Sequence, residues 1–260
     1  MSDQTLGNKV SVVTGGAGGI GRAISYKLAA AGSTVLIFGR DQDKGSRVVH
    51  EIERQGGLAM FVPTDLAREN EIEASANYVI KEHGGADILV NNAALSGFMG
   101  PVVDTPIEDA VKTVNVNLIS AFHLSQLFLP LMIDKAYGRI INISSVAYRH
   151  NTRNSATYNM SKAGLNSFTK TLSNEVASHG VTVNAIAPGL VMTDRIRNSR
   201  IPGIAAKQGI SQEDVLNKLA SDTPTGRFTQ PEEVAGLVMF LASEAADNIT
   251  GEIVNIAGGY

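Results

Sequence analysis

The sequence predicts an α/β fold in which helices cover both faces of a parallel β-sheet. Short apolar runs alternate along the 260 residues with longer segments that carry the periodicity of amphipathic helices. Consecutive positions within the runs are apolar, as expected of strands that are buried on both faces. Strict alternation of strands and helices is typical of parallel sheets, because each strand needs a crossover to reach the next.

The limits of each element follow from turn residues. Gly32 ends the first helix, and Pro231 opens the last one, where its missing N–H costs nothing. Strands are expected at Lys9–Thr14, Thr34–Phe38, Leu58–Val62, Asp87–Asn91, Arg139–Ser144, Val181–Ala187 and Ile253–Ile256. Helices are expected at Gly19–Ala31, Asp43–Gln55, Glu69–His83, about Ile107–Lys135, Ala156–Ser178 and Pro231–Ala242.

We expect residues 1–260 to form a single domain, because no linker and no repeat of fixed period divides them. One region interrupts the alternation of strands and helices. Residues 190–229 lie between a strand and the last helix and contain no clear strand. Open α/β sheets often carry a lid or specificity element at such a position, so we expect a substrate-loop insertion here.

Composition excludes several classes of protein. The net charge of −3 gives no electrostatic reason to expect nucleic acid or membrane binding. The chain has no cysteine, which excludes disulfides and thiolate chemistry. Its first residues lack the apolar core of a secretion signal, and apolar stretches such as Leu127–Ile133 are too short to span a bilayer. A cytoplasmic protein without a metal is expected.

A glycine-rich run, Thr14-Gly-Gly-Ala-Gly-Gly-Ile-Gly21, closes the first strand and opens the first helix. Gly15 permits a tight turn, while Gly19 and Gly21 allow a pyrophosphate to approach the backbone and the helix to pack on the strand. The helix N-terminus would supply N–H groups and partial positive charge to the phosphates. The alternative interpretation is a tight corner without a ligand.

The end of the second strand, Phe38-Gly-Arg-Asp41, bears on the choice of dinucleotide. Folds of this type often place an acid here for the ribose hydroxyls, or an arginine for a 2′-phosphate. The terminal position is Gly39 and Arg40 follows it, which favours NADP over NAD. In the alternative interpretation, Arg40 is a solvated surface residue and Asp41 caps the next helix.

Other polar residues follow the later strands. Asp65-Leu66 follows the third strand, Asn91–Ala94 the fourth, Ser145 the fifth and Pro188-Gly189 the sixth. Because parallel strands end at one edge, where open α/β sheets bind ligands, these residues are expected to share a site.

Tyr158 and Lys162 stand four residues apart, which places them on one face of a helix. A free tyrosine titrates near ~10, and a neighbouring cation stabilises its phenolate. The pair is therefore a candidate acid/base device.

Taken together, the motifs resemble those of the short-chain dehydrogenase/reductase family, in the branch made of one compact domain. The resemblance covers Lys9 to Gly259 and rests on Thr-Gly-x-x-x-Gly-x-Gly, Asn-Asn-Ala, Asn117, Ser145, Tyr-x-x-x-Lys and Pro-Gly in order. It implies a Rossmann-type, doubly wound sheet of seven parallel strands, an NAD(P) cofactor and a homotetramer. Ala94 departs from the family, which commonly has Gly at this position.

By this resemblance, Tyr158 is the general acid in reduction and the general base in oxidation. Lys162 would lower the pKa of Tyr158 and hold the nicotinamide ribose. Ser145 would hydrogen-bond the substrate oxygen, with Ser144 as its neighbour, and Asn117 would support a water-linked proton relay from Lys162.

The resemblance also implies where the cofactor binds. Residues after the third strand would flank the adenine, those after the fourth the ribose side, and those after the sixth the nicotinamide carboxamide. The full set expected is Gly15, Gly19, Ile20, Gly21, Arg40, Asp65, Leu66, Asn92, Ala93, Tyr158, Lys162, Pro188, Gly189, Val191 and Thr193.

The expected function is NAD(P)-dependent interconversion of an alcohol and a carbonyl by hydride transfer. The substrate stays open between a 3-oxoacyl thioester and a sugar, polyol or other small hydroxy compound. Basic residues near the site allow an anionic substrate, or else a solvated or subunit-contact loop: Arg149, His150, Arg153, Arg195, Arg197, Arg200 and Lys207. The alternative function is a non-catalytic dinucleotide-binding or scaffolding protein that retains the fold.

Overall fold

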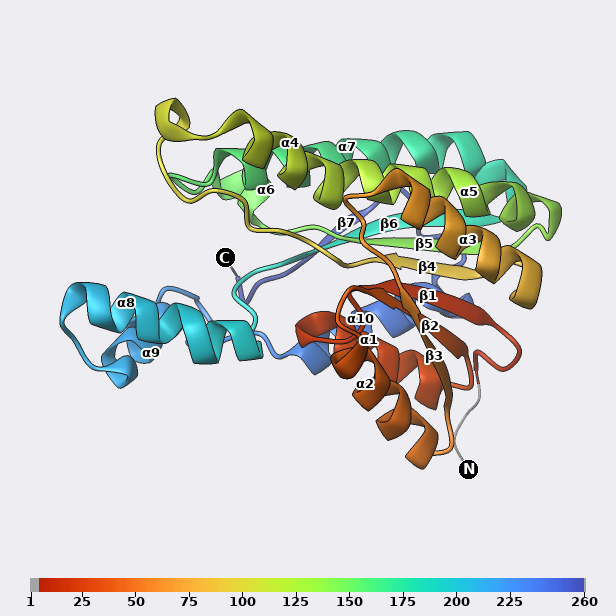
Figure 1. Ribbon diagram of the computed structural model, residues 1–260, viewed down its shortest axis with the longest axis horizontal. Helices are drawn as coiled ribbons and strands as arrows, with labels where there is room; N and C mark the ends of the chain where they lie inside the picture. Colours follow the sequence, from red (N-terminus) through yellow and green to blue (C-terminus); the bar gives the residue numbers. More distant parts are fainter. Residues whose placement is uncertain (1–4, 260) are drawn as a thin grey trace.

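The computed structural model describes residues 5–259. Its centre is a sheet of seven parallel strands in the order β3-β2-β1-β4-β5-β6-β7 (Figure 1). The strands are β1 (Val10–Thr14), β2 (Thr34–Gly39), β3 (Leu58–Pro63), β4 (Ile88–Asn91), β5 (Gly138–Ile143), β6 (Val181–Pro188) and β7 (Ile253–Ile256). The order reverses between β1 and β4, the point at which a Rossmann-type sheet forms a ligand crevice. The predicted seven-stranded doubly wound fold is confirmed.

Helices lie on both faces of the sheet (Figure 1). On one face are α1 (Gly19–Ala30), α2 (Gln42–Arg54) and α10 (Pro231–Ala242), and on the other α3 (Glu69–His83), α4 (Ile107–Val114), α5 (Ser120–Asp134) and α7 (Ala156–Val176). Short helical turns complete the described chain: α6 (Ala147–His150), Val102–Asp104, Ala177–His179 and Glu244–Ala246.

Two apolar cores form, one on each face of the sheet, because successive strand residues point to opposite faces. Val12 and Leu36 pack in one core with α3, α5 and α7, while their neighbours Val13 and Ile37 pack in the other with α1, α2 and α10. β3 is an edge strand, and Leu58 on it is 63% exposed. Apolar residues in this strand therefore do not all become core.

The long predicted helix at 107–135 forms, but not as one regular helix. A π-helical turn, Asn115–Ile119, separates α4 from α5. By length and composition alone, the stretch Ile107–Asp134 is apolar enough to cross a membrane, although 44% of its most apolar window is buried inside the fold. Leu124, Phe128 and Met132 are fully buried in the core beneath it. Core helices of globular proteins have this composition.

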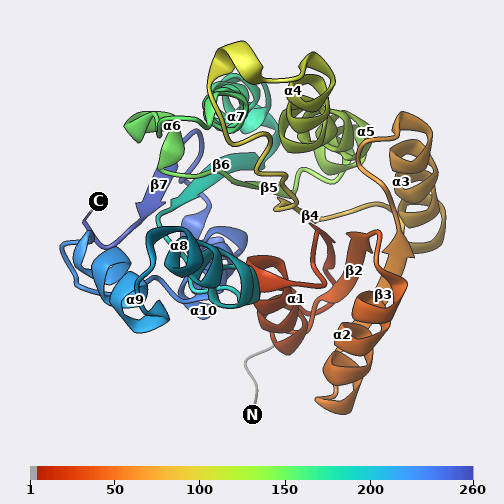
Figure 2. The ribbon, with the colours of Figure 1, turned by 60° about the vertical axis from the view of Figure 1, so that its left-hand side comes forward.

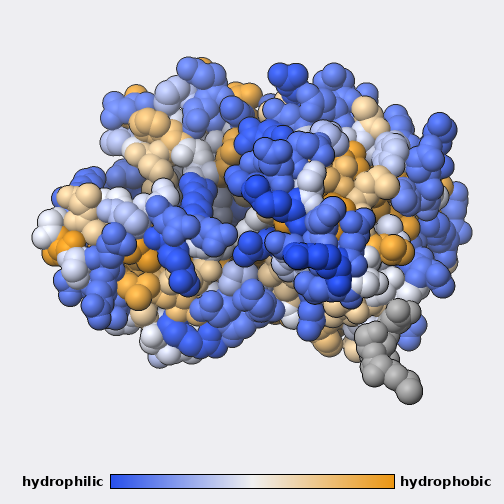
Figure 3. Space-filling model, turned by 60° about the horizontal axis from the view of Figure 1, so that its bottom comes forward, coloured by the Kyte–Doolittle hydropathy of each residue, from blue (hydrophilic) through white to orange (hydrophobic). Residues whose placement is uncertain are grey.

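Residues 190–229 form a largely helical insertion. It contains a π-helical turn (Ile196–Arg200), α8 (Ile201–Gln208) and α9 (Gln212–Ser221), and its ends meet where Val191 bridges Thr229. In Figure 1, α8 and α9 project to one side of the sheet, apart from the helices on its two faces, and Figure 2 brings this side forward. They have a small apolar cluster of their own, built on Ile201, Ala205 and Val215. Seen from the side of the molecule that lies below in Figure 1, the surface is mostly hydrophilic, with scattered hydrophobic groups (Figure 3).

Candidate active site

The turn between β1 and α1 is packed too tightly for side chains at two of its glycines. A Cβ on Gly21 would lie 2.3 Å from the carbonyl oxygen of Gly15, and one on Gly15 would lie 3.1 Å from Nδ2 of Asn92. Gly15 also has φ +64°, a left-handed conformation that glycine adopts without strain. The turn is therefore held close against the start of α1.

The N-terminus of α1 fits a phosphate group. No side chain caps its first turn, so its N–H groups are left for another acceptor. A Cβ on Gly18 would meet nothing within 4 Å, and Gly19 faces the side chain of Thr193, whose Cγ2 would lie 3.3 Å from a Cβ at that position. Ile20 is the second residue of the helix. These features are what a dinucleotide pyrophosphate requires.

Arg40 is exposed at the carboxyl end of β2, where a 2′-phosphate would lie. Asp41 does not compete for such a ligand, because it caps α2 by accepting a hydrogen bond from the N–H of Lys44 at 3.0 Å. Asp65 lies nearby, since the N–H of Thr64 donates to the carbonyl of Gly39. The cap expected in the alternative interpretation is thus present, and Arg40 remains available beside it.

Thr14 holds the ends of β1 and β4 together, a role that the sequence analysis did not assign. Its Oγ1 accepts hydrogen bonds from the N–H groups of Asn92 at 2.9 Å and Ala93 at 3.0 Å. Asn92 in turn donates from Nδ2 to the carbonyl of Thr14 at 2.8 Å. The sequence signal for this role was the position of Thr14 as the first residue of the glycine-rich motif. Ala94, the departure from the family pattern, is exposed.

Asn117 lies in the π-helical turn and is 2% exposed. Its Oδ1 accepts from the N–H of Leu95 at 2.7 Å, and its Nδ2 donates to the carbonyl of Leu95 at 2.9 Å and to Oγ of Ser161 at 3.0 Å. The side chain therefore joins the loop after β4 to α7, one residue before Lys162. Ser161 was not predicted, because only the fold brings it to Asn117.

Ser145 and Tyr158 are brought together by the end of β5 and the first turn of α7. The Oγ of Ser145 accepts a hydrogen bond from the N–H of Ala147 at 3.2 Å, and its side chain also acts on the phenol of Tyr158. Burial raises the pKa of Tyr158 above its usual value, while the interaction with Ser145 and the charges of Arg195 and Arg200 oppose the rise. The phenol is thus held next to the one hydroxyl that the sequence analysis paired with it. Ser144 is buried and turns away, toward the carbonyl of Lys162.

Lys162 is buried beneath Tyr158. Its side chain is 2% exposed, its Nζ lies 5.8 Å from the centre of the Tyr158 ring, and it donates to the carbonyl of Ile143 at 2.7 Å. Burial lowers the pKa of this ammonium to about 8. A buried lysine with a depressed pKa is typical of functional sites. The expected lowering of the Tyr158 pKa by Lys162 stays a prediction.

The segment after β6 closes the arrangement. The carbonyl of Pro188 accepts from the N–H of Val146, and the N–H of Gly189 donates to the carbonyl of Ile256, each at 3.0 Å. Val191 is 6% exposed and belongs to the apolar core. Leu66 is likewise buried, at 8% exposed. The remaining predicted residues line the carboxyl edge of the sheet.

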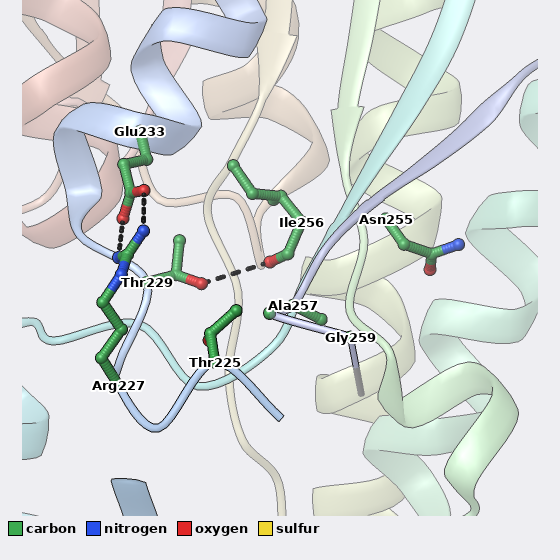
Figure 4. A pocket seen from close by; sticks show the side chains of 9 residues that line it. Thr225, Arg227, Thr229, Glu233, Asn255, Ile256, Ala257 and Gly259 are labelled. Atoms are coloured by element: carbon green, nitrogen blue, oxygen red, sulfur yellow. Dashed lines mark hydrogen bonds and ion pairs between the residues drawn. The ribbon is translucent and has the colours of Figure 1, made fainter. Parts of the chain in front are cut away.

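Two cavities lie near the site, and the second is lined in part by Gly19 and Thr193 of the expected cofactor set. One of about 400 Å³ lies between β7 and the loop before α10, where Arg227 and Glu233 form a paired contact of 2.7 Å (Figure 4). The other, of about 230 Å³, lies between the start of α1 and the segment from Met192 to Arg197. Neither cavity is lined by Ser145, Tyr158 or Lys162, so neither is the place where these catalytic candidates would act.

Among the described residues, Glu69, Glu73 and His123 form a group whose potential ligand atoms all lie within 4.8 Å of one another. Its members come from α3 and α5, which lie far apart in the chain, so the sequence alone does not reveal the group. Both glutamates are exposed, and none of the three belongs to the predicted site.

Comparison with known proteins agrees with this geometry. The family profile described as "Enoyl-(Acyl carrier protein) reductase" matches residues 15–260. The chain is 39% identical over 255 residues to the 3-oxoacyl-[acyl-carrier-protein] reductase FabG of Aquifex aeolicus, covering 98% of each chain. It is 38% identical over 255 residues to the D-beta-hydroxybutyrate dehydrogenase of Rhizobium meliloti, covering 97% of this chain and 98% of that one.

Solved structures are equally similar. L-sorbose reductase from Gluconobacter frateurii, complexed with NADPH and L-sorbose, superposes with a TM-score of 0.94 at 30% identity, covering 99% of this chain and 98% of that one. NAD+-bound xylitol dehydrogenase superposes with a TM-score of 0.90 at 28% identity, covering 98% of this chain and 99% of that one.

A doubly wound sheet with a phosphate-binding turn and a buried Tyr-Lys pair defines a dinucleotide-dependent oxidoreductase. The chain belongs to the short-chain dehydrogenase/reductase family, whose members act on alcohols and ketones with NAD(P).

Proposed function

We propose that the protein interconverts an alcohol and a carbonyl, with Tyr158 as the acid/base group. The interaction of Ser145 with Tyr158, whose ring lies 5.8 Å from Nζ of the buried Lys162, is the observation that carries this proposal. Hydride transfer to a ketone needs a polarised carbonyl and a proton carrier, and it needs no metal. The two hydroxyls supply both functions when a carbonyl oxygen lies between them.

The roles follow from the contacts. In reduction, Tyr158 donates its phenolic proton to the substrate oxygen, which Ser145 also holds by a hydrogen bond. Lys162 keeps a donor beneath the phenol, and Asn117 fixes the loop and helix that carry the site. In oxidation, Tyr158 takes the proton of the alcohol. Burial of the phenol limits exchange of this proton with bulk water.

NADP(H) is the preferred cofactor in this proposal, and NAD(H) is the second choice. When bound, the nicotinamide supplies the hydride. Gly15, Gly19, Ile20 and Gly21 would cradle its pyrophosphate, and Arg40 its 2′-phosphate. The remaining contacts would come from the edge of the sheet, at Asp65, Leu66, Asn92, Ala93, Pro188, Gly189, Val191 and Thr193, and from Tyr158 and Lys162.

A hydride-transfer assay tests the proposal. The enzyme is expected to consume NADPH with at least one member of a panel of 3-oxoacyl thioesters, ketoses, oxo acids and simple ketones. The variant Tyr158→Phe, which keeps the ring and removes the proton, is expected to lose activity while still binding NADPH. Cofactor binding without turnover on any substrate would instead favour the alternative of a non-catalytic dinucleotide-binding protein.

The proposed assembly is a homotetramer. Large apolar side chains form an exposed row along the helix from α4 to α5, at Ile107 (75% exposed), Val111 (51%), Ile119 (49%) and Phe122 (48%). Met160 on the adjacent α7 is 57% exposed. A second copy of this chain, which presents the same row, would cover these side chains. Light scattering of Phe122→Glu is expected to show smaller species. The cytoplasmic location stays a prediction.

A further inference from the structure

The segment that follows Thr193 begins beside the start of α1 and leads into the helices of the insertion. Its start is fixed by the bridge of Val191 to Thr229 and by the contact of Thr193 with Gly19. It then enters the π-helical turn Ile196–Arg200 directly. Three arginines fall within six residues here: Arg195, Arg197 and Arg200.

In the π-helical turn, two of these arginines point to the same side and the third points elsewhere. Its closing bond runs from the N–H of Ile201 to the carbonyl of Ile196, so residues five apart lie one above the other. Arg195 and Arg200 have this spacing and share one side of the turn. Arg197 faces elsewhere, into the cavity beside Arg22 and Gly19. The segment therefore presents a pair of guanidinium groups, not a scatter of three.

The charge of this pair is not neutralised by the protein. Within residues 5–259, neither side chain forms an ion pair with a carboxylate. Arginines elsewhere do: Arg139 pairs with Asp247, and Arg227 pairs with Glu233. Both charges of the pair also act on the Tyr158 phenol, which places them on the reaction side of the segment. A guanidinium pair beside the reacting atoms favours an anionic ligand group, which it can bind in a bidentate manner.

We propose that Arg195 and Arg200 form a carboxylate subsite beside Tyr158, and that the substrate is a small hydroxy acid or its oxo acid. This inference rests on the proposed function. A 3-oxoacyl thioester has no charge near its ketone and leaves the pair without a ligand, whereas an oxo acid places a carboxylate within a few bonds of the reacting carbonyl. Two of the other basic candidates, Arg149 and His150, already have interaction partners.

The test compares acids with neutral substrates of the same size. The probes are acetoacetate against methyl acetoacetate, and 5-ketogluconate against L-sorbose. Reduction at pH 7 is measured, because protonated Tyr158 is the active form in that direction and a further rise of its pKa then matters little. The wild-type enzyme is expected to show kcat/KM at least about tenfold higher for the acid of a pair that it accepts.

The second part of the experiment removes the charges of the two arginines. Arg195→Gln and Arg200→Gln are each expected to lower kcat/KM for the acid by about 10- to 100-fold, mainly through KM, and to leave the neutral partner unchanged. Lys207→Gln, which removes an exposed charge from α8 in the same insertion, is expected to change neither. Circular dichroism melting curves of the variants control for folding.

The outcomes separate two kinds of failure. Preference for the neutral member of each pair, or an equal loss on acid and neutral substrates in the Arg→Gln variants, overturns the carboxylate subsite and leaves the proposed oxidoreductase intact. No turnover of any carbonyl with either cofactor removes the proposed function, and the subsite with it.

Discussion

The side chain of Ser145 acts on the phenol of Tyr158, although one follows β5 and the other lies on α7. This interaction is one of those that oppose the rise of the Tyr158 pKa caused by burial. It also places the two hydroxyls where a carbonyl oxygen can lie between them. The interaction thus links the acidity of Tyr158 to its position.

Removal of this interaction should change both the rate and its pH dependence. In Ser145→Ala the phenol loses a group that lowers its pKa, so kcat/KM for alcohol oxidation is expected to rise only at higher pH than in the wild type. At neutral pH the loss is expected to be about 10²-fold or more, as for other donors to a reacting oxygen. Ser144→Ala, next to it, is the control and should keep the wild-type profile. An unchanged profile in Ser145→Ala would exclude the coupling.

The packing of the glycine-rich turn predicts opposite outcomes for two neighbouring glycines. In Gly21→Ala, the added Cβ would lie 2.3 Å from the Gly15 carbonyl, so the turn must shift. We expect a loss of roughly 1–3 kcal/mol in unfolding free energy and weaker NADPH binding. Gly18→Ala adds a Cβ with nothing within 4 Å, at φ −157°, and should be close to neutral. Denaturant titration and fluorescence titration with NADPH measure both; equal effects would be inconsistent with the packing.

The lowered pKa of Lys162 predicts that the free energy of unfolding depends on pH. Its pKa is lowered from 10.5 to about 8 in the folded state, so above about pH 8 the unfolded state binds more protons. Burial of the charge therefore costs stability fully below pH 8, and the cost is relieved as pH rises from 8 to 10.5. Relative to Lys162→Met, the wild type should gain about 2–3 kcal/mol over this range. Urea titrations of both proteins from pH 7 to 10.5 measure the difference, and a constant difference would contradict the depressed pKa.

Arg40 predicts the cofactor preference. Arg40→Ala should raise KM for NADPH about tenfold or more and leave KM for NADH unchanged, because only NADPH carries the 2′-phosphate. Steady-state kinetics with both cofactors and one substrate provide the measurement, and NADH serves as the internal control. A wild-type enzyme that already prefers NADH would contradict the assignment of Arg40.

The sequence predicted the strands well because their signal is local. Each strand begins and ends within one residue of its predicted limits, since a buried strand is a short apolar run closed by polar or turn residues. The exposure of a strand residue depends on the order of the strands and cannot be read from composition. Leu58 and Met60 are as apolar as residues of β1, yet they are exposed because β3 is at the edge of the sheet.

The site was predicted as a set of residues but not as a set of contacts. The motif spacing identified Tyr158, Lys162 and Ser145, and Asn117 came with the family pattern. The bond of Asn117 to Ser161, the bond of Thr14 to Asn92, and the raised pKa of Tyr158 depend on burial and on approach between distant segments. Neither burial nor the approach of distant segments can be read from the spacing of residues in the sequence. The cap of α9, Ser211 with Asp214, was readable in the sequence and marks the helix that the prediction missed.

The π-helical turn at Asn115–Ile119 holds one residue more than a regular helical turn would. A regular helix turns by about 100° per residue, so a one-residue deletion here would keep the helix and rotate everything before it relative to everything after it. Asn117 would then leave Leu95 and Ser161, or the buried Thr113 of α4 would turn away from the interior. The length of this stretch is thus fixed by the site, and its tolerance to insertion and deletion should be lower than that of any surface loop.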